Sequence, residues 1–229
     1  GSLSVTRRST QASHVGNYVL FSGGLTGLST NRSEVDAFDS AMTRTTPASL
    51  SASRYSHCPA SIGGYALFAG GVIGNNTLTN IVDAYDTSLT RTTAASLSTA
   101  RYSFASTTNG DYALMGGGHN YITGIDVVES YSTGLTHSVL APLSVGRTSL
   151  MAASCAGFSL FAGGMTPSDS TVTKFVDAYT PSLTKTEVDP LNTVKYIGAG
   201  ATAGNYALFG GGRIDGLTHT TIVEGYTVI

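Results

Sequence analysis

The stretch Tyr65-Ala66-Leu67-Phe68-Ala69-Gly70-Gly71 decides how this chain folds, because it returns in closely related form along the whole sequence. Similar stretches of seven residues begin at Tyr18, Tyr112, Phe158 and Tyr206, so the leading aromatic residues are 47, 47, 46 and 48 positions apart. A period of this length is typical of repeat architectures, in which no single copy buries its apolar face alone. We therefore predict one domain over residues 1–229 with five repeats, at about 3–49, 50–96, 97–142, 143–190 and 191–229.

Each repeat contains four short runs that have the composition of β-strands. In the second repeat these runs extend from Arg54 to about Ile62, from Tyr65 to Ala69, from Ile81 to Asp86 and from about Thr90 to Ala95. Alternating runs of aromatic and β-branched residues bounded by glycine indicate strands, and no segment shows the sustained period of a helix. Four strands in each of five repeats predict an all-β fold, a five-bladed β-propeller with four-stranded blades.

The two ends of the chain raise the question of how the ring of blades closes. The first inner strand is expected at Leu3 to Arg7, and the third strand of the fifth repeat at Ile222 to Tyr226. The sequence then leaves the fifth blade without an outer strand. Because an open sheet edge is a template for pairing, self-association through this blade is one predicted partnership.

The residues of the second repeat also carry a family resemblance. From Arg54 through Tyr65–Gly71 and Val82–Asp86 to Leu97–Arg101 the chain resembles a kelch repeat, and the match covers essentially the whole sequence. The run from Val82 to Thr92 is similar to kelch-like proteins of bacteria and their phages. That family usually has a tryptophan about six residues after its Tyr-Asp pair, whereas this chain has no tryptophan and carries Thr92 there. The resemblance implies a β-propeller whose blades differ from the family in their outer packing.

Charged residues are scarce and recur at fixed repeat positions. They make up 11% of the chain with a net charge of −2, which gives no indication of a nucleic acid partner, and no apolar run is long enough for membrane insertion. One repeat position is basic and another acidic, and we predict that they form five structural ion pairs: Arg7, Arg54, Arg101, Arg147 and Lys195 with Asp36, Asp83, Glu129, Asp177 and Glu224. The alternative is a basic ring at the mouth of the channel that binds an anionic group.

A second set of cations follows a Leu-Thr or Met-Thr pair on the expected outer strand of four repeats. These are Arg44, Arg91, His137 and Lys185. We interpret them as edge charges, because charge on an edge strand discourages pairing between sheets.

The segments that follow each glycine pair differ most among the five repeats. Loops held together by a rigid scaffold commonly carry binding sites, although solvated loops that tolerate change are the alternative. The candidate ligand-binding residues on these segments are Arg32, Asn75, Asn76, His119, Tyr121, Asp169, Arg213, Asp215 and His219. Their side chains suit a polar ligand such as a glycan or a peptide.

The sequence therefore predicts a non-enzymatic binding module with a glycan or protein ligand, on a bacterial or virion surface. It predicts no metal or cofactor, since His119 and His219 lack further ligands at metal-binding spacing. Cys58 and Cys155 occupy different repeat positions, so a disulfide is not expected. Two other hypotheses stay open: a sugar-modifying enzyme with its site at the channel mouth, and a structural spacer in a longer surface protein.

Overall fold

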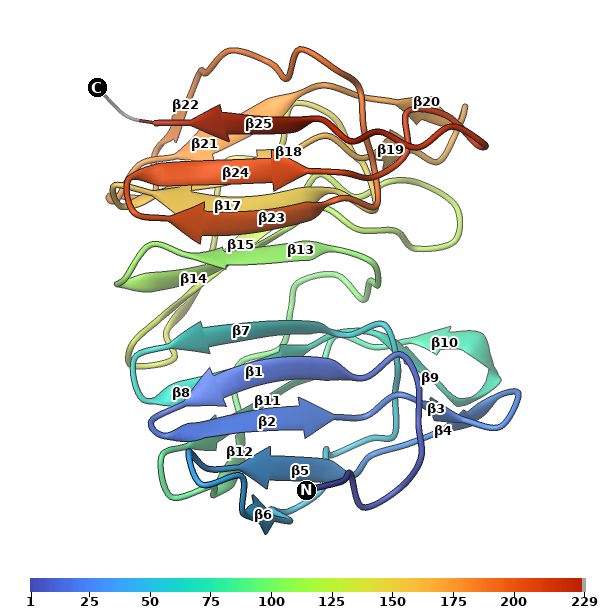
Figure 1. Ribbon diagram of the computed structural model, residues 1–229, viewed down its shortest axis with the longest axis vertical. Coiled ribbons are helices and arrows are strands. Elements are labelled where there is room, and N and C mark those ends of the chain that lie inside the picture. Colours follow the sequence, from blue (N-terminus) through green and yellow to red (C-terminus); the bar gives the residue numbers. More distant parts are fainter. Residues whose placement is uncertain (228–229) are drawn as a thin grey trace. The chain divides into compact units, whose positions relative to one another are not determined.

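The computed structural model describes residues 1–227, and these residues form short antiparallel strands with a single 3-10 turn (Figure 1). Val228 and Ile229, which end the fifth predicted repeat, lie outside the described residues. The chain separates into two compact units. Unit 1 contains Gly1–Tyr102 and Tyr131–His137, and unit 2 contains Ser103–Ser130 and Ser138–Ile229. The single domain stays a prediction.

Two four-stranded antiparallel sheets and two small hairpins make up most of unit 1. The first sheet has the order β1 (Gln11–Val15), β2 (Tyr18–Ser22), β5 (Val35–Phe38) and β6 (Arg44–Thr45). The second sheet contains β7 (Cys58–Ile62), β8 (Tyr65–Ala69), β11 (Val82–Asp86) and β12 (Arg91–Thr93). The hairpins are β3 (Leu25–Thr26) with β4 (Thr30–Asn31), and β9 (Val72–Ile73) with the turn η1 (Gly74–Asn76) and β10 (Thr77–Leu78).

The remaining strands repeat the same plan. The third sheet contains β13 (Ala105–Thr108), β14 (Tyr112–Gly116), β15 (Val128–Ser132) and β16 (His137–Val139). The fourth contains β17 (Met151–Cys155), β18 (Phe158–Ala162), β21 (Val176–Tyr179) and β22 (Lys185–Thr186), with the hairpin β19 (Met165–Thr166) and β20 (Thr171–Val172). The fifth contains β23 (Ala199–Ala203), β24 (Tyr206–Gly210) and β25 (Val223–Tyr226).

The all-β class and the four-stranded antiparallel sheets are confirmed, while the count of five blades stays a prediction. The first strand was placed too early in repeats one and two, because β1 begins at Gln11 rather than Leu3 and β7 at Cys58 rather than Arg54. The cause is a residue with left-handed backbone ahead of the strand, Ser9 with φ 55° in repeat one and Ser56 with φ 52° in repeat two. A positive φ interrupts an extended chain, so the preceding residues form a link and not a strand.

Apolar side chains fill the space between the first and second sheets of unit 1. Leu20, Val35 and Ala37 of the first sheet pack with Phe68 and Tyr85 of the second. The glycine pair that follows the second strand allows the backbone of the neighbouring segment to approach closely. Gly71 has φ +102°, and a Cβ there would lie 2.7 Å from the carbonyl oxygen of Tyr55. Only glycine fits this position without movement of the neighbouring backbone.

Candidate functional site

A buried ion pair joins the predicted basic and acidic positions of the second repeat. Arg54 Nη2 lies 2.7 Å from Asp83 Oδ2 and also donates to the carbonyl oxygen of Phe68 at 2.9 Å. The backbone N–H and the hydroxyl of Ser51 donate to the same carboxylate at 3.1 and 3.0 Å. These donors replace the water that the charged groups lose on burial.

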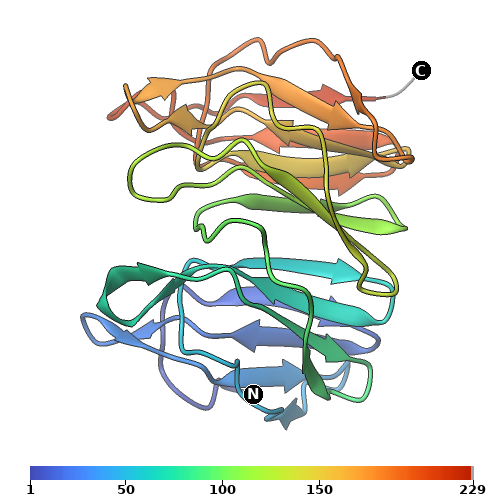
Figure 2. The ribbon, with the colours of Figure 1, turned by 180° about the vertical axis from the view of Figure 1, so that it is seen from behind.

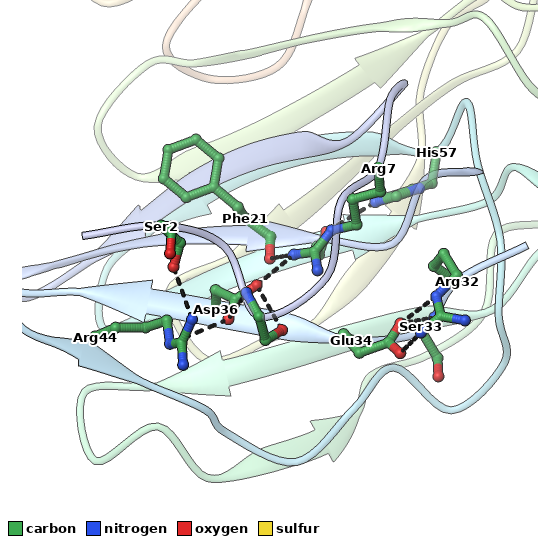
Figure 3. Close-up of polar contacts among 11 residues, drawn as sticks. Ser2, Arg7, Phe21, Arg32, Ser33, Glu34, Asp36, Arg44 and His57 are labelled. Carbon is green, nitrogen blue, oxygen red and sulfur yellow. Dashed lines mark hydrogen bonds and ion pairs between the residues drawn. The ribbon is translucent and has the colours of Figure 1, made fainter. Parts of the chain in front are cut away.

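The same arrangement recurs in other repeats, and Figure 3 shows it around Asp36. The distances are 2.8 Å for Arg7–Asp36, 2.8 Å for Arg147–Asp177 and 3.0 Å for Lys195–Glu224. Arg101 and Glu129 occupy the remaining position of each kind, and both are fully buried. The structure brings these four predicted pairs into contact. Their structural role, as opposed to anion binding, stays a prediction.

The outer strand gives the same carboxylate a second cation. Arg91 Nη1 lies 2.9 Å from Asp83 Oδ1, and Lys185 Nζ lies 2.8 Å from Asp177 Oδ1. In repeat one Arg44 Nε lies 3.7 Å from Asp36 (Figure 3). The interpretation of Arg44, Arg91 and Lys185 as edge charges was therefore incomplete. The sequence contains this information. Arg91 lies opposite Tyr85 on the neighbouring strand, and Asp83 comes two positions before Tyr85, so Arg91 and Asp83 are diagonal neighbours across the two strands.

In the cluster of the fourth repeat the electrostatics favour the ionised form of Asp177. Burial by itself would raise the pKa of Asp177, but the charge of Arg147 and hydrogen bonds from Lys185, Ser144 and Arg147 outweigh it, so the pKa is lowered. The Asp177 cluster therefore holds its carboxylate in the charged form between Arg147 and Lys185. This chemistry suits a scaffold better than proton transfer, because a lowered pKa keeps Asp177 unprotonated near neutral pH.

A groove of about 720 Å³ lies between the two hairpins of unit 1, which extend side by side in both views (Figures 1 and 2). Its volume falls within the range of small-ligand sites. Polar side chains and one aromatic ring dominate the lining, with a few aliphatic residues. The lining residues are Arg8, Leu25, Leu28, Ser29, Asn31, Ser53, Tyr55, Ile73, Gly74, Asn75 and Asn76.

Two hydrogen bonds hold the walls of the groove in place. Arg8 Nη2 donates to the carbonyl oxygen of Leu28 at 3.1 Å, and Asn31 Nδ2 donates to that of Val72 at 3.2 Å. The second bond joins one hairpin to the other. Asn75 and Asn76 form the rim, with φ of 57° and 53°, and their side chains are exposed. Asparagine tolerates this backbone better than most residues, which explains its use at both positions.

Among the predicted ligand-binding residues, Asn75 and Asn76 line this groove. Arg32 is also in unit 1, but its guanidinium forms an ion pair with Glu34 and does not line the groove. The segment after the first and second glycine pairs was expected as a loop, and the structure folds each into a hairpin.

The other candidates lie on three segments of unit 2. His119 and Tyr121 contact edge to face, with ring centroids 6.2 Å apart, and Tyr121 is 46% exposed. The carboxylate of Asp169 accepts from the backbone of Thr171, and that of Asp215 from the backbone of Leu217 and Thr218, so both acids brace their own turns. Arg213 and His219 face each other as a backbone bridge. Their role in binding stays a prediction.

Sequence reasoning missed Arg8 and Tyr55, which line the groove. Each directly follows the basic residue of its repeat, and each bridges through its backbone to the first residue after the glycine pair, Arg8 to Leu25 and Tyr55 to Val72. A comparison of the repeats at this position would have indicated them, because Arg8, Tyr55, Tyr102, Thr148 and Tyr196 occupy it.

Within residues 1–227, no group of three or more His, Cys, Asp or Glu side chains is placed to hold a metal ion. The same residues contain no helix with the length and hydrophobicity needed to cross a lipid bilayer.

Successive antiparallel sheets of this kind define an all-β fold with blade-like sheets, consistent with a β-propeller. The solved structure of YjhT is similar, with a TM-score of 0.78 and 14% sequence identity over 97% of this chain and 82% of that chain. At this identity the likeness is one of fold. No family model matches the chain, and no curated protein matches it.

Proposed function

We propose that this protein is a non-enzymatic recognition module that binds a polar ligand, a glycan or a peptide, in the groove between the two hairpins of unit 1. The scaffold that we propose is a five-bladed β-propeller of kelch-type repeats, of the kind found in bacteria and phages. The observation that carries the binding proposal is the groove itself, which has the size of a ligand site and a mainly polar lining on hairpins anchored to sheets.

The chemistry of the lining supports a polar ligand. Arg8 offers fixed N–H donors, and the amides of Asn31, Asn75 and Asn76 offer both donors and acceptors. Tyr55 adds an aromatic ring that can cover an apolar face of the ligand. A few directional groups around a ring fix orientation as well as affinity.

The same lining supports binding in preference to catalysis. General acid–base chemistry uses a carboxylate, imidazole, amine, phenol or thiol with a pKa near the working pH. Among the residues that line the groove there is no carboxylate, imidazole, lysine amine or thiol. The side chains of Arg8, Asn31, Asn75 and Asn76 are suited to hold a ligand by hydrogen bonds.

The test is a glycan array and a peptide array probed with the protein and with two variants of unit 1. Tyr55→Ala removes the ring, and the double variant Asn75→Gly with Asn76→Gly removes two amides while keeping a residue that accepts positive φ. The matched control is Asp111→Asn, on an exposed turn of unit 2. We expect a ligand that binds the protein and the control equally and binds both groove variants at least about tenfold more weakly.

Two results would overturn the proposal. One is a ligand whose binding is unchanged in both groove variants, and the other is the absence of binding on both arrays. Thermal unfolding of each variant shows whether it keeps the fold, so a loss of binding can be assigned to the groove.

A further inference from the structure

Three residues of unit 1 share the repeat position that directly follows the inner basic residue. They are Arg8, Tyr55 and Tyr102, which follow Arg7, Arg54 and Arg101. Arg8 and Tyr55 line the groove between the two hairpins, whereas Tyr102 is not among the lining residues. The place of Tyr102 relative to the groove therefore decides whether a bound ligand has a second aromatic ring within reach.

One backbone hydrogen bond recurs at this position and places both tyrosines against a hairpin. The N–H of Gly24 donates to the carbonyl oxygen of Arg54 at 2.9 Å, which brings the next residue, Tyr55, beside the hairpin β3–β4. In the same way the N–H of Gly71 donates to the carbonyl oxygen of Arg101 at 2.9 Å. Tyr102 therefore lies beside the start of the hairpin β9–β10.

Tyr55 meets the same hairpin from the groove. Its backbone forms a bridge with Val72, the first residue of β9 and the residue that follows Gly71. Tyr55 and Tyr102 thus adjoin the start of one hairpin, and both are half-buried. Burial raises the pKa of Tyr102, and the charge of the Tyr55 phenol raises it further, so the two phenol groups lie within electrostatic range of each other.

The backbone beside the groove favours a glycan over a peptide. Arg8 and Leu25 exchange two backbone hydrogen bonds at 2.8 Å, and Tyr55 and Val72 exchange two at 3.1 and 2.9 Å. The carbonyl oxygen of Val72 also accepts from Asn31 Nδ2. An extended peptide binds a sheet through N–H and C=O groups that have no partner in the free protein. At these positions the groove offers side chains in their place.

The side chains suit sugar rings that follow one another. A pyranose ring has an apolar face of C–H groups and a rim of hydroxyl groups. The ring of a tyrosine covers an apolar face and leaves its hydroxyl group for a polar partner. The amides of Asn75 and Asn76 at the rim of the groove donate to and accept from hydroxyl groups. Two neighbouring tyrosines can therefore hold two sugar rings of one chain.

We propose that the groove binds an oligosaccharide, and that this chain extends beyond the groove so that one sugar ring covers Tyr55 and a further ring covers Tyr102. The inference rests on the proposed function, since it assigns the ligand class of the same site. Tyr102 is then a specificity-determining residue for chain length, because a monosaccharide in the groove contacts Tyr55 alone.

The test is isothermal titration calorimetry with homologous series of glucose, galactose and N-acetylglucosamine, from the monosaccharide to the hexasaccharide. We expect at least one series to bind the protein with an affinity that rises about tenfold or more with chain length. Tyr102→Ala should weaken binding of the hexasaccharide about fivefold or more and leave the monosaccharide unchanged. Tyr55→Ala should weaken binding of both.

Two further variants assign the effect to the ring of Tyr102. Tyr102→Leu keeps an apolar side chain at this position, so it retains packing while the aromatic ring is lost, and we expect the same loss with the hexasaccharide. Tyr206→Ala is the matched control, because this tyrosine of unit 2 is 53% exposed, and binding should not change. Thermal unfolding shows which variants keep the fold, and the dependence on chain length is measured on the unmodified protein.

The outcomes separate this inference from the proposed function. Absence of binding by all three series, an affinity independent of chain length, or unchanged binding in folded Tyr102→Ala or Tyr102→Leu would overturn the inference. If Tyr55→Ala alone weakens binding, or if peptides bind in the groove and the sugar series do not, the proposed function stands without it. A sugar series whose binding Tyr55→Ala leaves unchanged would contradict both.

Discussion

At the scale of single residues, the feature that repeats is a buried acid held by several donors. Asp83 accepts hydrogen bonds from Ser51, lies 2.7 Å from the inner cation Arg54 and lies 2.9 Å from the outer cation Arg91. The acid and the inner cation have fully buried side chains, whereas that of Arg91 is 28% exposed. Loss of the buried Arg54–Asp83 pair should therefore lower the free energy of unfolding more than loss of the partly exposed Arg91.

We predict that Asp83→Asn lowers the free energy of unfolding by about 3–5 kcal/mol, because it leaves the Arg54 charge buried without its counter-charge. Arg91→Met should lower it by no more than about 1 kcal/mol, since solvent screens the outer pair. Urea unfolding of both variants measures the difference. Equal losses in the two variants would contradict the ranking.

His57 makes stability depend on pH in unit 1. Burial, and to a smaller extent the charge of Arg54, lowers the pKa of His57 well below its ordinary value. The Nε2 atom of its ring shares one hydrogen bond with the hydroxyl of Ser22, at 2.8 Å. In the unfolded chain the imidazole titrates near pH ~6.5. Below that pH the unfolded state binds the extra proton, so stability is full above pH ~6.5 and declines as the pH falls towards the folded pKa.

We predict that this decline is at most about 1.4 kcal/mol for each pH unit and that His57→Gln removes it, because an amide can keep the Ser22 hydrogen bond without titrating. Urea unfolding at pH values between about 5 and 7 measures the slope. The same slope in protein and variant would show that another group causes the decline.

Asp177 governs a lower range of pH in unit 2. Its pKa is lowered because the charge of Arg147 and hydrogen bonds from Lys185, Ser144 and Arg147 outweigh the effect of burial. The ionised form therefore stabilises the fold above the unfolded pKa of about 3.9, and this contribution is lost as the pH falls through the folded pKa. We predict that Asp177→Asn flattens the pH dependence of unfolding below pH ~4 and leaves the range from about 5 to 7 unchanged.

At the scale of elements, the glycine pair at the end of the second strand controls how closely segments pack. Gly71 combines φ +102° with a Cβ position 2.7 Å from the carbonyl oxygen of Tyr55. Gly74, three residues later in η1, has open space around its Cβ position. The two glycines therefore form a matched pair for a test.

We predict that Gly71→Ala lowers the free energy of unfolding by about 2 kcal/mol or more, since the new methyl group needs both backbone strain and displacement of Tyr55. Gly74→Ala should change it by less than about 1 kcal/mol. Thermal or urea unfolding compares them, and a larger loss in Gly74→Ala would refute this account of the glycine pair.

The strands show why sequence located some elements better than others. The run Tyr65–Ala69 was predicted with the bounds that β8 has, because its alternation and its closing glycines mark both ends. The start of β7 was placed four residues early, because Ser56 takes a positive φ that its residue type does not signal. The second cation of Asp36, Asp83 and Asp177 was missed because strand register, and not spacing along the chain, brings it to the acid.

At the scale of the whole molecule, repeats predict the scaffold better than they predict the site. Asn75 and Asn76 were named from the variation among segments, and both line the groove. Arg8 and Tyr55 were not named, because their distance from those residues along the chain is large and only backbone bridges to Leu25 and Val72 bring them to the hairpins. The proposed function therefore depends on positions where the repeats differ from one another, and not on the residues that recur in every repeat.

Hydrogen–deuterium exchange of the protein with and without the best ligand from the arrays tests the central claim most directly. The account predicts slower exchange in the hairpins at residues 25–31 and 72–78, because a ligand in the groove covers both. Slower exchange confined to residues 119–126, 165–174 or 213–221 of unit 2, with no change in the two hairpins, would contradict it.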